Sequence, residues 1–136
     1  MNVSIFCHDE IDIPNAENVN IEKIDSLEHS SIENLYLNDC LDHIPPVDHP
    51  QLLLQIHNVL SDNGLLYIQG PDLKQTMIAT VFNKINIQLA QMLLYNKRTF
   101  SHTAQNIKDI LESNNYITTS QKYINIFEYH FIFKKV

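Results

Sequence analysis

The chain has 136 residues, a length that suits one domain with a single hydrophobic core. Its 44% hydrophobic and 18% charged residues are typical of a folded globular protein and exclude an intrinsically disordered chain. The formal net charge of -7 argues against nucleic-acid binding, which depends on basic side chains that contact phosphates. No apolar run is long enough to cross a bilayer, and the first residues do not resemble a secretory signal. We therefore expect a cytoplasmic protein without a membrane partner.

Cysteine and glycine are both scarce. Cys7 and Cys40 lie in apolar, strand-like settings, so a disulfide framework is not expected. Gly64 and Gly70 are the only glycines, where average usage gives roughly nine or ten, and a glycine-rich phosphate loop is therefore excluded. The histidines form no H-x-x-x-H pair, and we predict no metal site.

The first third of the chain predicts three short strands. Residues 3–7 form a mostly apolar run that ends in a polar turn. Residues 18–21 follow a loop marked by Pro14 and Asn15. Residues 34–37 form the third run, which ends in Asn38 and Asp39.

The next segment predicts a helix that is followed at once by a strand. Asp48 or His49 can cap this helix, and Pro50 fits its first turn. Apolar residues then recur at helical spacing: Leu52, Leu53, Ile56, Val59 and Leu60. Asn63 and Gly64 predict a left-handed stop. The all-apolar run 65–68 predicts a strand buried on both faces, which completes a βαβ unit.

The last third predicts helices and then a hairpin. Asp72 is placed to cap a helical region up to about Tyr95, which forms one broken helix or two short ones. The ordinary interpretation of this region is helical core, and the alternatives are a lid or a dimer surface. Residues 104–111 predict a surface helix. The runs 116–123 and 127–133 predict an antiparallel hairpin, because the second alternates with period two and the connection is short.

Three segments resemble the class I S-adenosylmethionine-dependent methyltransferase family. Residues 35–44, LYLNDCLDHI, resemble the family segment I-Y-a-s-H-v-L-E-H-l. Residues 59–73, VLSDNGLLYIQGPDL, resemble R-V-L-k-P-G-G-x-L-x-I-x-x-P-D-L. His102, a helix and then LESNNY at 111–116 resemble H…L-L-e-x-a-G-F. The resemblance implies a single domain over residues 1–136 with a three-layer, Rossmann-like α/β methyltransferase fold. Its sheet is mostly parallel, ends in an antiparallel hairpin and is reduced at the N-terminus.

The resemblance also implies a site at the carboxyl edge of the sheet, where S-adenosylmethionine and a small-molecule acceptor would bind. The expected cofactor-binding residues are Cys7, His8, Asp9, Asn20, Asn38 and Asp39. Asp39 or His43 is the expected general base or acceptor-orienting group, and His102 is the expected substrate contact. Alternatively, His43 only helps Asp42 to cap the following turn, and His102 only belongs to the start of a helix.

The N-terminal third departs from the family pattern. The family has a G-x-G turn after the first strand and an acidic residue after the second, where this chain has CHDE at residues 7–10 and Asn20. Side chains in that turn, and the charges of Asp9 and Glu10, would weaken cofactor binding. The short stretch 21–35 suggests a missing or vestigial third strand. Two functions therefore stay open: a methyltransferase, or a catalytically inactive relative that serves as a binding or oligomerisation module, including a homo-oligomer.

Overall fold

The computed structural model describes residues 1–7, 13–38, 40–95 and 100–136, with the backbone alone at 38, 94 and 95. Residues 8–12, 39 and 96–99 lie outside this description. The expected site residues His8, Asp9 and Asp39 are among them.

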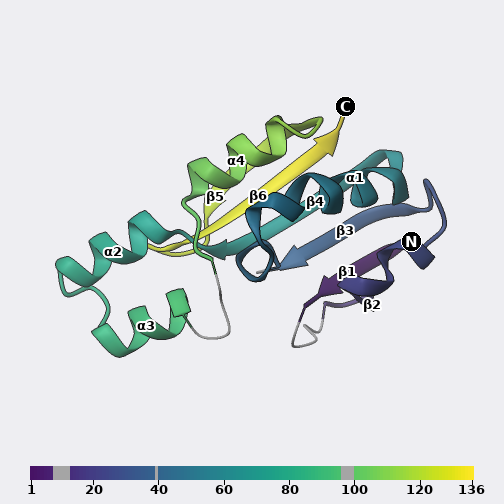
Figure 1. The fold of residues 1–136 in the computed structure, drawn as a ribbon. Helices are drawn as coiled ribbons and strands as arrows, with labels where there is room; N and C mark the ends of the chain where they lie inside the picture. Colours follow the sequence, from purple (N-terminus) through teal and green to yellow (C-terminus); the bar gives the residue numbers. More distant parts are fainter. Residues whose placement is uncertain (8–12, 39, 96–99) are drawn as a thin grey trace.

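A six-stranded sheet forms the centre of the molecule, in the order β2-β1-β3-β4-β6-β5 (Figure 1). Its strands are β1 (Asn2–Phe6), β2 (Glu17–Asn20), β3 (Ile32–Asn38), β4 (Leu60–Pro71), β5 (Tyr116–Tyr123) and β6 (Glu128–Lys135). The first four are parallel, whereas β6 runs antiparallel to both β4 and β5. The predicted mostly parallel, Rossmann-like sheet with a C-terminal antiparallel hairpin is confirmed.

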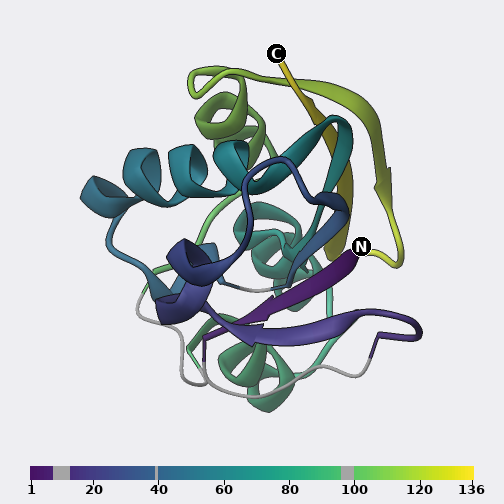
Figure 2. The same cartoon turned by 90° about the vertical axis from the view of Figure 1, so that its right-hand side faces the viewer.

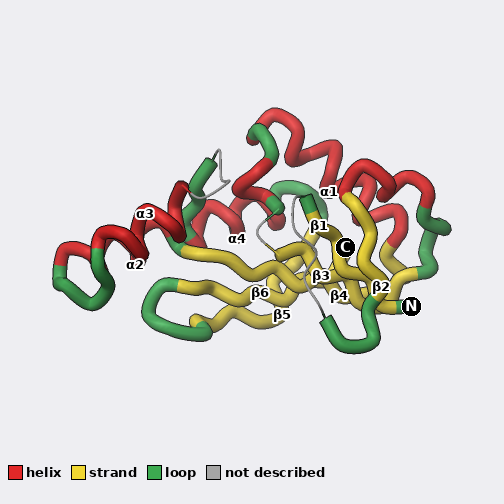
Figure 3. The backbone as a smooth tube through the Cα atoms, turned by 90° about the horizontal axis from the view of Figure 1, so that it is seen from below, coloured by secondary structure: helices red, strands yellow, loops and turns green. Residues whose placement is uncertain are grey.

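Two helices cover one face of this sheet. They are α1 (His49–Val59), which joins β3 to β4, and α4 (Ala104–Glu112), which precedes β5. Figures 2 and 3 show both on the same side of the strands, together with the 3-10 turn η1 (Ile21–Ser26). In the described part of the chain no helix lies on the opposite face, where the rings of Tyr36 and Tyr67 stack at 4.7 Å. The described helices and the sheet therefore form two layers, where the resemblance implies three.

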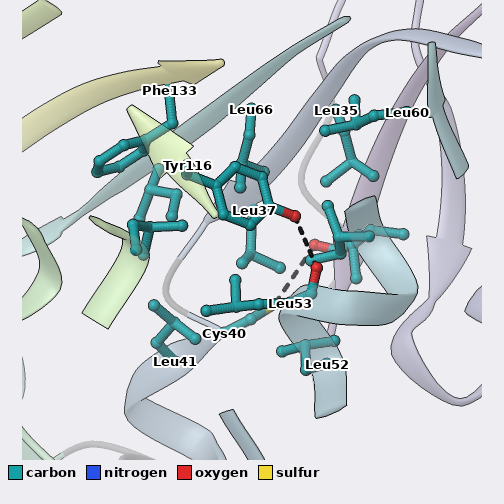
Figure 4. Packing of buried hydrophobic residues seen from close by; sticks show 14 of the residues in the cluster. Leu35, Leu37, Cys40, Leu41, Leu52, Leu53, Leu60, Leu66, Tyr116 and Phe133 are labelled. Carbon is teal, nitrogen blue, oxygen red and sulfur yellow. Dashed lines mark hydrogen bonds between the residues drawn. The ribbon is translucent and has the colours of Figure 1, made fainter. Parts of the chain in front are cut away.

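The hydrophobic core lies between the sheet and these helices. Along β6, Tyr129, Phe131 and Phe133 are buried and the residues between them are partly exposed, as the period of two predicts. Leu53 and Ile56 of α1 belong to the same buried cluster as these β6 side chains. The hydroxyl of Tyr116 donates to the carbonyl oxygen of Leu53 at 2.6 Å and so ties β5 to α1 inside the core (Figure 4).

The end of α1 differs from the prediction. The helix ends at Val59, and Leu60 is already extended, with φ -67 and ψ 137. Gly64 therefore lies within β4 and forms no left-handed stop, and its φ is not positive. A Cβ atom on Gly64 would lie 2.9 Å from the carbonyl oxygen of Ile32, where the register between β3 and β4 shifts. The close approach of β3 requires glycine here, which the local sequence does not reveal.

The predicted helical region after β4 consists of two short helices, α2 (Leu73–Val81) and α3 (Ile87–Tyr95). They project from one end of the sheet (Figure 1). The Asp72 carboxylate accepts a hydrogen bond from the N–H of Gln75 at 3.2 Å, which confirms the predicted cap of α2. No helix in the described ranges is long and apolar enough to cross a membrane.

Candidate functional site

The carboxyl ends of the parallel strands meet at one edge of the sheet, as the site prediction requires. Cys7 directly follows β1, Asn20 ends β2 and Asn38 ends β3. The pairing of Phe6 with Asn20, and of Ile5 with Leu37, brings these three strand ends side by side. In open α/β sheets this edge is where ligands bind.

The two cysteines pack against each other at the end of β1. The Sγ of half-buried Cys7 donates to the carbonyl oxygen of Cys40 at 3.9 Å. The Sγ of buried Cys40 donates to the carbonyl oxygen of Ile5 at 3.5 Å. The Cys40 hydrogen bond lowers the pKa of the Cys7 thiol, although burial acts in the opposite direction. Neither cysteine forms a disulfide, and both sulfur atoms lie against backbone carbonyl oxygens at this edge of the sheet.

Asn20 uses its side chain locally. Its Oδ1 accepts a hydrogen bond from the backbone N–H of Glu22 at 2.9 Å and caps η1. An acidic residue at this position would offer a ribose diol two charged acceptor oxygens. Asn20 has one side-chain oxygen, which is uncharged and already accepts one hydrogen bond, and its Nδ2 is a donor.

The connection between β1 and β2 is short. It comprises the ten residues 7–16, and the described ones, 7 and 13–16, are not helical. A parallel crossover needs about a dozen or more residues and usually contains a helix. In Rossmann-type sheets the helix after the first strand directs its N-terminal N–H groups at the ligand. The described residues supply no such helix.

Together these residues do not fit S-adenosylmethionine in the manner of the family. The turn after β1 lacks glycine, the connection is too short for an ordinary crossover helix, and Asn20 is occupied as a cap. We therefore derive no catalytic step through this cofactor.

Two buried histidines lie against the 3-10 turn η2 (Leu41–His43), directly after the strand-end site. His49 Nε2 lies 3.2 Å from the carbonyl oxygen of Leu41 and 3.1 Å from that of Ile44. Its ring centre is 5.4 Å from that of His102. The predicted cap at the start of α1 is absent, because neither Asp48 nor His49 caps it with its side chain: Asp48 holds the N-cap position without a side-chain hydrogen bond.

His102 is 8% exposed and packs against His49. Burial, and secondly the charge of His49, lowers the pKa of His102 below its ordinary value. The uncharged ring is therefore favoured at neutral pH. His43 is half-buried in the last position of η2 and lies closer in sequence to the strand end.

The sequence does not predict that His49 is buried. No local pattern marks it as buried, because its partners come from η2 and from the segment before α4. In the described ranges, no group of three or more His, Cys, Asp or Glu side chains is placed to hold a metal ion. The roles of Cys7, Asn20, Asn38, His43 and His102 stay predictions.

No protein-family model matches this sequence, and no curated protein matches it either. Solved structures do match it. A Pyrococcus horikoshii protein superposes with a TM-score of 0.65 at 13% identity, over 90% of this chain and 60% of its own. The 1,6-didemethyltoxoflavin-N1-methyltransferase of Burkholderia thailandensis, crystallised with S-adenosylhomocysteine, gives 0.63 at 12% identity, over 89% and 51%.

A methyltransferase from Archaeoglobus fulgidus, described as SAM-dependent, gives a TM-score of 0.60 at 13% identity, over 89% of this chain and 68% of its own. This chain thus spans about half to two thirds of the length of these three proteins. Identities this low establish the fold and not the activity. The strand order, the C-terminal hairpin and these superpositions together show that the chain has the Rossmann-like fold of the class I S-adenosylmethionine-dependent methyltransferases.

Proposed function

We propose that this chain is a catalytically inactive methyltransferase-fold protein that serves as a binding or oligomerisation module. The observation that carries this proposal is the connection of ten residues, 7–16, between β1 and β2. Methyl transfer requires a cofactor that is held in line with its acceptor. The part of the fold that would hold it is the part that this chain has shortened.

Two contacts at the same edge support the proposal. The Asn20 side chain caps η1, and the Cys7 and Cys40 sulfur atoms pack against the end of β1. Both features stabilise the fold locally. They also place side chains where the family pattern has a glycine turn close to the cofactor and an acidic residue that accepts hydrogen bonds from the ribose.

A second candidate function is S-adenosylmethionine-dependent methyl transfer to a small molecule. It is favoured by the parallel strand ends, which share one edge, and by half-buried His43 directly after them. In that case Asp39 or His43 would act as base and His102 would contact the acceptor. The cofactor would lie against residues at the three strand ends: Cys7, His8, Asp9, Asn20, Asn38 and Asp39.

Isothermal titration calorimetry of the full chain with S-adenosylmethionine and S-adenosylhomocysteine separates the two functions. We expect no saturable heat at ligand concentrations on the order of 1 mM, a limit that corresponds to about 4 kcal/mol of binding free energy.

The matched variant for this titration is Asn20→Asp, which keeps a good cap for η1 and restores the family's acidic residue. If the chain is an inactive module, this variant is also expected to give no saturable heat with either ligand. One-to-one binding by the wild-type chain, strengthened by Asn20→Asp, would establish the methyltransferase candidate instead.

The same proposal assigns the protein to the cytoplasm and gives it no nucleic-acid partner. Support comes from Cys7 and Cys40, which form no disulfide and so suit a reducing compartment, and from the net charge of -7.

A further inference from the structure

Each of the two cysteines of this chain reaches the strand end of the other. Cys7 directly follows β1, and Cys40 is the N-cap residue of η2 after β3. The Sγ of Cys7 lies 3.9 Å from the carbonyl oxygen of Cys40, and the Sγ of Cys40 lies 3.5 Å from that of Ile5. The two side chains also hydrogen-bond to each other. Both sulfur atoms therefore lie between the same two strand ends.

The spacing of these strand ends suits a disulfide. β1 and β3 are neighbouring parallel strands, and Ile5 pairs with Leu37. Cys7 comes two residues after this pair and Cys40 comes three residues after it. Neighbouring strands lie about 4.8 Å apart, and a disulfide joins Cα atoms that are about 4.4–6.8 Å apart. A cross-link can therefore form by rotation of the two side chains, with the strands in place.

We propose that Cys7 and Cys40 form a reversible disulfide by exchange with a small disulfide such as oxidised glutathione. The Cys7 thiolate attacks one sulfur of oxidised glutathione, which forms a mixed disulfide and releases one glutathione. The Cys40 thiolate then attacks the Cys7 sulfur and releases the second glutathione. Two S–S bonds break and two form in sequence. The two electrons of the cysteines reduce the glutathione disulfide, and their two protons go to the glutathione thiols.

The burial of the two side chains assigns the two roles. Cys7 is half-buried, whereas Cys40 is 1% exposed and belongs to the hydrophobic core (Figure 4). A small disulfide in water can therefore reach Cys7, and Cys40 is reached by the Cys7 sulfur that already lies beside it. The hydrogen bond with Cys40 lowers the pKa of the Cys7 thiol, although burial acts in the opposite direction. A lowered pKa favours the thiolate, which is the attacking form.

The cross-link would join the end of β1 to η2 across 33 positions of the chain, a segment that contains β2, η1 and β3. It would hold the strand-end edge of the sheet in one arrangement. In a reducing compartment the resting form is the dithiol, and the disulfide forms when the glutathione pool becomes oxidised. This inference goes beyond the proposed function, because it requires no cofactor and no partner protein.

The test is to equilibrate the full chain with mixtures of reduced and oxidised glutathione, quench it with acid and measure its intact mass. The wild-type chain is expected to form an internal disulfide that retains no glutathione. Cys40→Ser is expected to retain one glutathione on Cys7, because no second thiol displaces it. Cys7→Ser is the matched variant, and its buried Cys40 is expected to react at least about 10-fold more slowly than Cys7 does in Cys40→Ser.

A second measurement needs no variant. The same titration in urea compares the folded wild-type chain with the unfolded one. Because the fold holds the two sulfur atoms together, the equilibrium constant for disulfide formation is expected to be about 100-fold larger in the folded chain, or more, as for a loop of this length.

An internal disulfide in the wild-type chain, a retained glutathione in Cys40→Ser and a larger equilibrium constant in the folded state support the proposal. A wild-type chain that stays reduced in about 5 mM oxidised glutathione overturns it, and so does one that retains glutathione or forms disulfides between chains. Equal equilibrium constants in the folded and unfolded chains also overturn it, as does uptake of glutathione by Cys7→Ser as fast as by Cys40→Ser. None of these results depends on whether S-adenosylmethionine binds.

Discussion

At the scale of single residues, Asp72 connects three elements through one carboxylate. Its Oδ1 accepts the N–H of Gln75 in α2, and its Oδ2 accepts the N–H of Ala104 in α4 at 3.1 Å. The hydroxyl of Tyr123 in β5 also donates to Oδ2, at 2.7 Å. Asp72 is only 3% exposed, so these donors take the place of the water that would otherwise surround its carboxylate. The role is structural, since every one of these bonds is to the protein itself.

We predict that Asp72→Ala lowers the free energy of unfolding by about 2–4 kcal/mol, because three hydrogen bonds to a buried carboxylate are lost. Urea denaturation at pH 7 measures this loss. Tyr123→Phe is the control, because it removes only one of the three donors and is expected to cost about 1 kcal/mol. Equal losses in the two variants would contradict the central role of the carboxylate.

His102 gives the protein a dependence on pH. Burial and the neighbouring His49 lower the pKa of His102 in the folded state, whereas in the unfolded chain it is close to 6.5. The unfolded state therefore binds the proton more readily. This contribution to stability is complete above about pH 6.5 and is lost as the pH falls from there through the folded pKa.

We predict that His102→Phe flattens the dependence of unfolding free energy on pH between 7 and 5. Phenylalanine keeps a ring in the buried position, where Nε2 of His102 has no partner in the described chain. The change also removes the hydrogen bond between the imidazole and the backbone of Leu41, which lowers stability by a similar amount at every pH above the pKa of the folded state. Urea denaturation across this range tests the prediction, and the two profiles should run parallel between pH 7.5 and 8.5. Parallel profiles down to pH 5 would show that another group titrates.

At the scale of elements, the pairing of β3 with β4 depends on Gly64. Residues 60 and 65 pair with residues 32 and 34, so β4 contains additional residues at this point. The irregularity brings the carbonyl oxygens of Ile32 and Ser61 to within 2.9 Å and 3.0 Å of the position of a Cβ atom on Gly64. These are backbone atoms, which cannot rotate away as a side chain would.

We predict that Gly64→Ala destabilises the protein by about 1–3 kcal/mol, as expected for an overpacked position. Thermal unfolding followed by circular dichroism measures the change. The neighbouring Asn63 is exposed, and Asn63→Ala is therefore the control, expected within about 0.5 kcal/mol of wild type. If Gly64→Ala were as stable as Asn63→Ala, β3 and β4 would be able to move apart at this point without a loss of free energy of unfolding.

At the scale of the whole molecule, two surfaces of the fold lack an ordinary covering. One sheet face carries no described helix, and there polar and aromatic side chains such as Ser4, Tyr36 and Tyr67 shield one another. By contrast, Val81 and Phe82 at the C-terminal end of α2 are exposed to water far more fully. An apolar surface of this size on a small protein indicates a binding surface, whereas a half-buried polar face does not.

Local patterns in the sequence were enough to predict most elements and their type. The period of two placed β6, helical spacing placed α1 and α4, and the polar turn before Leu73 identified the cap at Asp72. The carboxyl edge could be located for the same reason, because parallel strands that follow one another end on the same side. The cap that Asn20 forms is also a local feature, since its partner is Glu22. It was not predicted, because the family resemblance assigned Asn20 to the cofactor.

Only the tertiary structure decided the features that join residues distant in the chain. Cys7 meets Cys40, His49 meets His102, and Gly64 meets the carbonyl oxygen of Ile32. The burial of the helical region up to Tyr95 was likewise decided only by the tertiary structure. Its sequence pattern is apolar whether the helices lie in the core or on the surface. Periodicity reports which side chains share a face, whereas burial depends on what the rest of the chain places against that face. The sequence by itself therefore determined the elements, and the tertiary contacts determined which of their faces were left for a partner.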